Sequence, residues 1–297
     1  VLQTTGLHGM MVLRDAGLMA GYQASAINQT LVQTGALHGG AHKRVAETAA
    51  WWLDCTADGG MALGANGHRQ TLRVRLMHAL VRGRLQRSLQ WDANWLGLPI
   101  NQVDMQATYL AFSVVQLLGL RMTGMLISRS DADAVMHLWR WIGWLMGVEV
   151  ALMCDDEATG RVLLYRNVIG QAPADHTSAQ LAQALMDEPL SRPYPWAQAL
   201  RGQIDRERHL SLVSWFVGAQ GMRNLGLPQR APWYPLMLLA PTAAGSLALR
   251  ALPFLETPWR AVSRWQQTRF HRHMVREPRA HEAGAEVTAG GAPARKR

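Results

Sequence analysis

The sequence predicts one all-α domain, a single-domain helical bundle with globin-like packing. Three observations predict it. Long segments carry apolar residues at the 3.6-residue period of a helix. No alternating polar and apolar stretch is long enough for a convincing strand, and the best candidate, 162–165, fits a helix equally well. A chain of 297 residues that is 48% hydrophobic and 17% charged can fill a sizeable core. We expect the helical domain at residues 1–276 and a disordered basic tail at 277–297.

Glycines and prolines divide the first half of the chain into helices. We expect two helices within 7–36, a third at about 42–55, and a long fourth at 67–89. Residues 102–124 are apolar all round, which predicts the buried central helix.

The second half continues the helical pattern. Ser130 and the two acidic residues after it are typical of a helix N-cap, and the helix that they open ends near Gly147. Two shorter helices are expected in 155–195, a strong one at 205–224 and a basic amphipathic one at 256–275. The longest charge-free run, 231–249, is interrupted by three prolines. This argues against a transmembrane helix and favours a buried or interfacial segment, which leaves contact with a membrane surface open.

The formal net charge is +9, and four of these charges belong to residues 269–297. Lysines and arginines do not alternate with aromatic residues in any run, so we expect no nucleic-acid partner. The arginines could instead meet the carboxylates of a cofactor. We expect a monomer. Because the chain begins at Val1, we expect its true start, with any export signal, to be missing.

Several cofactor and metal motifs are absent from the sequence. Cys55 and Cys154 form no Cys-x-x-Cys pair, so no structural zinc site is indicated. The absence of Cys-x-x-Cys-His excludes covalent haem attachment, and a disulfide between the two cysteines is left open. No glutamate has a histidine three residues later, as a di-iron bundle requires. Motifs for zinc proteases, nucleotide phosphates and serine hydrolases are missing too.

The helix predicted at 67–89 carries His78, which we place within its apolar stripe. Arg75 and Arg82 lie about one turn away on either side. Such a histidine is either a packed structural residue or a ligand. As a ligand, a neutral imidazole could hold a haem iron, and Arg75 or Arg82 could pair with the propionates. The apolar residues that define the stripe are Leu72, Leu76, Ala79, Leu80 and Leu85.

The helix predicted at 42–55 presents Arg44, Glu47, Thr48 and Trp51 at helical spacing on one face. This face is either solvated, with an Arg44–Glu47 ion pair, or a polar patch that points into a pocket. The neighbouring Trp51 and Trp52 favour the pocket.

Four segments, in this order, carry a resemblance to a known family: 44–52, 73–82, 97–104 and 138–148. Together they resemble the latex-clearing-protein type of rubber oxygenase. The wider family includes a fungal membrane-bound oxygenase that cleaves the prenyl chain of a mycophenolic acid precursor. The likeness extends over roughly residues 7–225.

The resemblance implies an all-helical fold with one non-covalent haem b and O2 as co-substrate. It makes His78 the proximal iron ligand. The family carries an Arg-x-x-Lys-Thr pattern on its distal helix, and here Arg44 and Thr48 match it while Glu47 replaces the lysine. That lysine can occupy the sixth position of the iron, so the substitution puts distal ligation in question. The family's glutamate base has no counterpart in 20–43, and Glu47 could substitute for it.

The implied activity is oxidative cleavage of carbon–carbon double bonds in polyisoprene or a related isoprenoid, which gives aldehyde and ketone ends. Arg44 would position and polarise oxygen, Thr48 would donate a hydrogen bond, and a lining rich in Met and Trp would hold the substrate. Rubber as substrate would require a secreted or periplasmic protein; otherwise we expect a cytoplasmic one. Two alternatives are a non-catalytic haem-binding sensor or carrier of the same fold, and a helical scaffold without a cofactor.

Overall fold

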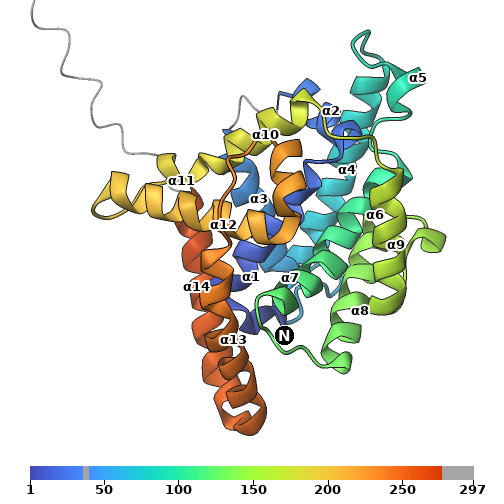
Figure 1. Cartoon of the computed structure of the whole chain (residues 1–297). Coiled ribbons are helices and arrows are strands. Elements are labelled where there is room, and N and C mark those ends of the chain that lie inside the picture. Colours follow the sequence, from blue (N-terminus) through green and yellow to red (C-terminus); the bar gives the residue numbers. More distant parts are fainter. Residues whose placement is uncertain (36–39, 276–297) are drawn as a thin grey trace, which may run out of the picture.

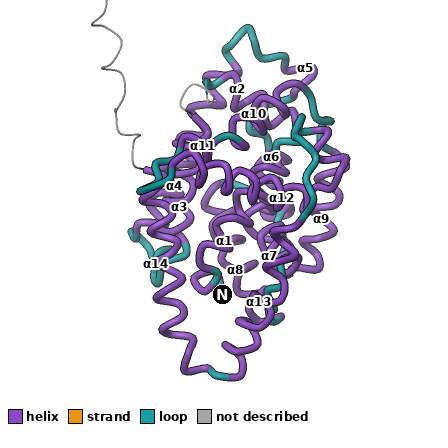
Figure 2. Tube along the Cα trace, turned by 60° about the vertical axis from the view of Figure 1, so that its left-hand side comes forward, coloured by secondary structure: helices purple, strands orange, loops and turns teal. Residues whose placement is uncertain are grey.

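The computed structural model describes residues 1–35 and 40–275, and within these ranges every regular element is a helix (Figure 2). The prediction of an all-α fold is confirmed. The basic tail predicted at 277–297 lies outside the described residues.

The first half contains η1 (Leu2–Thr4), α1 (Gly6–Val12), the π-helix η2 (Leu13–Met19), α2 (Ser25–Gln33), α3 (Gly40–Cys55), α4 (Asn66–Gln86) and α5 (Ala93–Leu96). It continues with α6 (Gln102–Leu110), the π-helix η3 (Ala111–Val115), α7 (Gln116–Met122), α8 (Arg129–Met146) and η4 (Val150–Leu152). The second half contains α9 (Glu157–Gly170), α10 (His176–Met186), α11 (Glu188–Ser191), α12 (Gln198–Asn224), α13 (Trp233–Ala251), η5 (Pro253–Leu255) and α14 (Glu256–Val275).

The apolar run at 102–124 forms the centre of the molecule, as predicted. It is one continuous helical rod made of α6, η3 and α7, and Leu110, Val114, Leu117 and Leu120 are fully buried along it. Helices α1, α8 and α9 and the π-helix η2 pack around this rod. A second buried cluster joins α3, α10 and α12. Figure 1 shows α8 and α9 on one side of the rod and α14 on the other.

Helix α8 begins two residues earlier than the sequence suggested. Ser128, not Ser130, is its N-cap, and the Ser128 side chain accepts a hydrogen bond from the backbone N–H of Asp131. The prediction of Ser130 as the cap was therefore wrong. The start of a helix is set by the side chain that accepts a hydrogen bond from an N–H group of the first turn, and Ser130 already lies inside that turn.

The outward face of α4 contradicts the predicted apolar stripe. Leu76 and Leu80 are 59% and 60% exposed, and Leu72 is exposed as well. At about 100° per residue, Leu76 and Leu80 lie roughly 200° around the helix from His78. The buried positions of α4 are Gly67, Thr71 and Leu85, and the last two are each seven residues from His78. His78 therefore does face inward, but on the side of the helix opposite to most of the leucines.

The charge-free segment at 231–249 forms a helix, α13, in spite of its prolines. Pro232 and Pro235 stand at the helix start, where their missing N–H groups cost nothing, and only Pro241 is internal. In the described part of the chain, one helical run has the length and composition to cross a membrane, Gln102–Met122, and 56% of its apolar window is buried. Helices α13 and α14 meet that test only as a pair, bent by 111°.

Candidate functional site

His78 projects from α4 into a small apolar cavity between α4, α6 and α8. The cavity has a volume of about 30 Å³. Three aromatic rings dominate one wall: Phe112 stacks on Trp139 with ring centroids 4.9 Å apart, and Trp51 meets both edge-on. Trp51 is held by a 3.0 Å hydrogen bond from its indole N–H to the Thr71 hydroxyl of α4. The lining residues are Trp51, His78, Met105, Thr108, Tyr109, Phe112, Trp139, Ile142, Gly143, Met146 and Val148.

The imidazole of His78 is neutral at physiological pH and has a buried nitrogen without a partner in the described part of the chain. Burial, reinforced by the positive charge of Arg82, lowers the pKa of His78. Its Nδ1 atom is buried and has no hydrogen-bond partner among the described residues. An unsatisfied buried polar atom costs about 1–3 kcal/mol. The residues therefore suit a group that uses a histidine nitrogen in an apolar setting, as an iron porphyrin does.

Arg75 and Arg82 lie roughly 40–60° around α4 from His78, and both are held by backbone carbonyl groups. Arg75 is exposed and Arg82 is half-buried, and neither lines the cavity. Arg75 donates to the carbonyl of Leu145 at the end of α8 (3.1 Å). Arg82 donates to Pro99 and Ile100 (3.2 and 2.5 Å). A guanidinium has five N–H donors, so each arginine keeps donors for another acceptor.

Two of the three residues proposed on α3 are exposed to solvent. Glu47 and Thr48 are exposed, and the Glu47 carboxylate lies 3.9 Å from the ammonium of Lys43. Arg44 is half-buried, and its guanidinium donates a long 3.5 Å hydrogen bond to the hydroxyl of Tyr22. None of the three lines the cavity at His78, whereas Trp51 on the same helix does. The face thus combines both expectations: it is solvated at Glu47 and Thr48 and turned into the cavity at Trp51.

Sequence reasoning missed most of the aromatic wall. Trp139 follows the apolar period of α8, and that period does not tell a core residue from a cavity wall. Phe112 lies in the π-helix η3. A π-helix shifts the direction of the side chains relative to an α-helix, so the spacing of an α-helix could not place Phe112.

Sequence reasoning also missed a buried polar network between η2 and α12. Asp15 accepts hydrogen bonds from Arg14 (2.5 Å) and contacts Nδ1 of His209 (2.7 Å), 194 residues away. Burial opposes ionisation of Asp15, but the charge of Arg14 and the hydrogen bonds from Arg14 and His209 keep the pKa of Asp15 below its usual value. Burial also lowers the pKa of His209, so its imidazole is neutral. The only sequence signal was a charged pair within an apolar stretch. The network joins η2 to α12.

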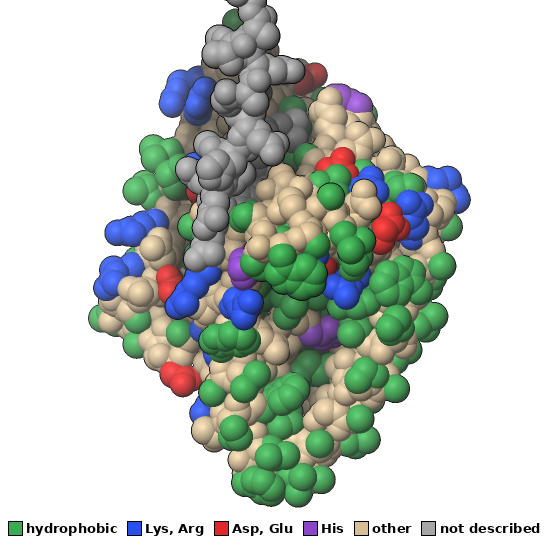
Figure 3. All heavy atoms as spheres, turned by 90° about the vertical axis from the view of Figure 1, so that its left-hand side faces the viewer, with side chains coloured by type: hydrophobic (Ala, Val, Ile, Leu, Met, Phe, Trp, Pro, Cys, Tyr) green, Lys and Arg blue, Asp and Glu red, His purple; other side chains and the backbone are tan. Residues whose placement is uncertain are grey.

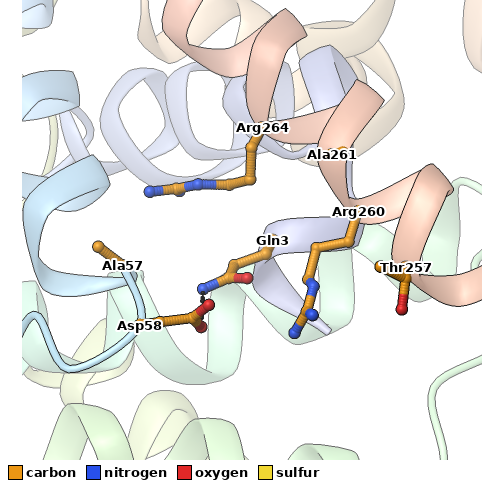
Figure 4. Close-up of a pocket in the computed structure, with 7 residues that line it drawn as sticks. All are labelled: Gln3, Ala57, Asp58, Thr257, Arg260, Ala261 and Arg264. Atoms are coloured by element: carbon orange, nitrogen blue, oxygen red, sulfur yellow. Dashed lines mark hydrogen bonds between the residues drawn. The ribbon is translucent and has the colours of Figure 1, made fainter.

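A larger hollow, of about 300 Å³, lies away from His78 between the α3–α4 loop and α14 (Figure 4). Asp58 and Arg260 point into it from opposite sides, and Gln3 donates to Asp58 (2.9 Å). It is polar and open, and no histidine lines it. We therefore place the candidate site at His78, although its cavity is smaller.

The described residues contain no group of three or more His, Cys, Asp or Glu side chains arranged for a metal ion. A metal at His78 would thus need most of its ligands from a cofactor. Cys55 and Cys154 are both free and buried, so they do not form the disulfide that was left open.

Comparison with known proteins gives two matches. The model of the family described as "ER-bound oxygenase mpaB/B'/Rubber oxygenase, catalytic domain" matches residues 4–276. A curated rubber oxygenase from a Streptomyces species is 28% identical over 79 residues, which are 26% of this chain and 19% of that protein. The match therefore covers about a fifth of the length of that relative. No solved structure matches. Because the family model covers most of the sequence, the chain belongs to the mpaB and rubber oxygenase catalytic-domain family.

Proposed function

We propose that the protein is a haem b-dependent oxygenase that cleaves carbon–carbon double bonds of polyisoprene or a related isoprenoid into aldehyde and ketone ends. Membership of an oxygenase family supports the reaction class. The observation that carries the proposal is the neutral imidazole of His78, with a buried nitrogen that lacks a partner, at an apolar cavity.

In this proposal, the haem supplies the activation of O2, and the residues of the chain supply its setting. His78 holds the iron, and Arg75 and Arg82 offer their remaining N–H donors to the propionates. Trp51, Phe112 and Trp139 exclude water and present an apolar surface to an isoprenoid.

The residues of α3 would act on the other reactants. Arg44 is the cation for positioning and polarising oxygen, and Thr48 is the hydroxyl donor. Glu47 would act as the base, because its carboxylate lies within one turn of Arg44 and Thr48 on the same helix. Its ammonium neighbour, Lys43, lies one turn earlier and holds it weakly.

The first experiment is an absorbance spectrum of protein expressed with haem supply. We expect a Soret band for the wild type, and loss of most of the haem in His78→Ala because the variant lacks the iron ligand. His137→Ala, which changes an exposed histidine of α8, is the matched control. Full haem content in His78→Ala would refute the ligand assignment. A colourless wild-type protein that takes up no added hemin would favour the alternative of a helical scaffold without a cofactor.

The second experiment tests the role of Glu47. Glu47→Gln keeps the size of the side chain and removes its charge, so we expect haem content to stay the same. Removing a general base typically lowers turnover by about 10²–10⁴-fold. The measurement is oxygen uptake and carbonyl product with a short isoprenoid. Unchanged turnover would remove Glu47 from the mechanism.

The alternative is a haem-binding sensor or carrier. The exposure of Glu47 and Thr48, outside the cavity, favours it. A protein with a normal Soret band that consumes no oxygen with any isoprenoid would support this alternative.

A further inference from the structure

The most apolar helix of the chain buries very little of itself. Residues 231–249 contain no charged residue, yet in α13 only Pro235 and Ser246 are buried. Leu236, Met237 and Leu247 are each more than half exposed. A surface helix of a soluble protein normally turns such side chains toward the core, so this face requires a covering partner.

The same apolar surface continues around the end of a hairpin. Helices α13 and α14 extend away from the rest of the molecule and meet at η5 (Figure 1). Phe254, at this tip, is 72% exposed. Figure 3 shows hydrophobic side chains gathered at the same end of the molecule. We call this surface the hairpin tip; its exposed apolar residues are Leu247, Leu252, Phe254, Trp259 and Val262.

The charges around the hairpin tip identify the partner. Between residues 231 and 275 the sequence has five arginines and one acidic residue, Glu256. Arg250 and Arg260 lie on either side of η5, and the guanidinium of Arg260 points into the open hollow of Figure 4. Arg260 takes part in no ion pair within the described residues. An apolar tip between cations complements anionic lipid, whereas a second copy of the same surface would bring like charges together.

The aromatic residues point to the same partner. Trp259 and Trp265 are half exposed on α14, and Trp233 is partly exposed at the start of α13. The Trp259 indole N–H donates to the carbonyl of Thr4 (2.9 Å), while about half of the residue stays exposed. Arg269 lies over the ring of Trp265, 5.1 Å from its centroid. Trp and Arg are the side chains that anchor proteins where lipid headgroups meet acyl chains.

We propose that the α13–α14 hairpin binds the surface of an anionic membrane. Phe254 and its apolar neighbours enter the boundary between headgroups and acyl chains, and Arg250 and Arg260 lie at the level of the phosphates. The hairpin lies in the interface and does not span the bilayer, because the chain turns back at η5 and α14 carries arginines along its length.

The test is co-sedimentation of the full chain with vesicles of phosphatidylcholine, with or without phosphatidylserine. We expect binding to the phosphatidylserine vesicles that weakens with salt. Phe254→Asp should lower the partition coefficient about tenfold or more, since it places a charge at the depth of the apolar tip. Arg260→Gln should lower it less. The readout involves neither haem nor turnover, so the result is independent of the proposed oxygenase activity.

The matched control is Leu89→Asp, the same kind of change at a fully exposed leucine. Leu89 lies in the connection between α4 and α5, and α5 is at the end of the molecule opposite the hairpin (Figure 1). The Leu89→Asp variant should bind vesicles like the wild type. Equal binding by Phe254→Asp and the wild type, or no binding by the wild type, would overturn the proposal. So would a wild-type dimer in light scattering that Phe254→Asp dissociates, because the partner would then be a second copy.

Discussion

At the scale of single residues, His8 should make stability depend on pH. Thr123 donates its hydroxyl proton to the carbonyl of Gly119 (2.8 Å), so the imidazole of His8 donates from Nε2 to the Thr123 oxygen (2.7 Å). Burial lowers the pKa of His8 to about 4. The unfolded chain binds a proton at this residue below a pH of about 6.5, and the folded chain does so only below about 4. The contribution of His8 to the free energy of unfolding is therefore fully present above pH 6.5, and it is lost as the pH falls toward 4.

The measurement compares urea unfolding of the wild type and His8→Gln from pH 7 to pH 4. We expect the variant to be less stable at pH 7 and to lose less of its stability on acidification, because glutamine does not titrate. His137→Gln, an exposed substitution, is the control. Parallel pH profiles for the wild type and His8→Gln would contradict the assignment.

His78 shows what the sequence can and cannot predict about one residue. Its motif was sufficient to select it as a ligand candidate. The direction of the His78 side chain was inferred from leucines of α4 that in fact point into solvent. The buried side chains on the same face of α4 are Thr71 and Leu85. Periodicity assumes that apolar residues face the core, and α4 breaks that assumption. Only the neighbouring helices decide which face is buried.

At the scale of elements, Gly119 allows close packing of α7 against α1. A methyl group added there would lie 2.5 Å from Cγ1 of Val12 and 3.4 Å from Cβ of Ala16. Val12 has a stiff side chain and is fully buried, so it cannot move away easily. We expect Gly119→Ala to lower the free energy of unfolding by about 1–3 kcal/mol. Urea unfolding checks this.

The control for that substitution is Gly245→Ala in α13, where an added methyl group meets nothing within 4 Å. It should be neutral or stabilise by up to about 1 kcal/mol, since alanine favours helix. If both variants behave alike, close packing at Gly119 is not the cause of its effect.

The helices themselves could largely be predicted, because glycine and proline boundaries and the 3.6-residue period are local signals. The two π-helices could not. The π-helices η2 and η3 pack against each other. Their i→i+5 hydrogen bonds coincide with this tertiary contact, which the local sequence does not record. The prolines of α13 do not interrupt the helix as the sequence suggested. Two of the three lie in or just before its first turn, where proline is tolerated.

At the scale of the whole molecule, the buried network of Arg14, Asp15 and His209 holds distant segments together. All three side chains are almost completely buried, and such charges persist only when paired. The pairing of Asp15 with His209 spans 194 residues. No reading of local spacing could find this pairing. For the same reason the parts of the aromatic wall around His78 that come from η3 and α8 were not predicted.

The cavity at His78 gives the last prediction, which rests on the proposed haem. Its volume of about 30 Å³ has room for a few water molecules at most. A porphyrin needs far more space, so its binding requires α4 to separate from α6 and α8. Since α4 already exposes most of its leucines, it loses little buried apolar area by moving.

We expect hydrogen exchange in α4 to be fast in the haem-free protein and slow after addition of hemin, with a higher midpoint of thermal unfolding. Both changes should be absent in His78→Ala and retained in His137→Ala. Binding of hemin that leaves exchange in α4 unchanged would show that the haem enters elsewhere.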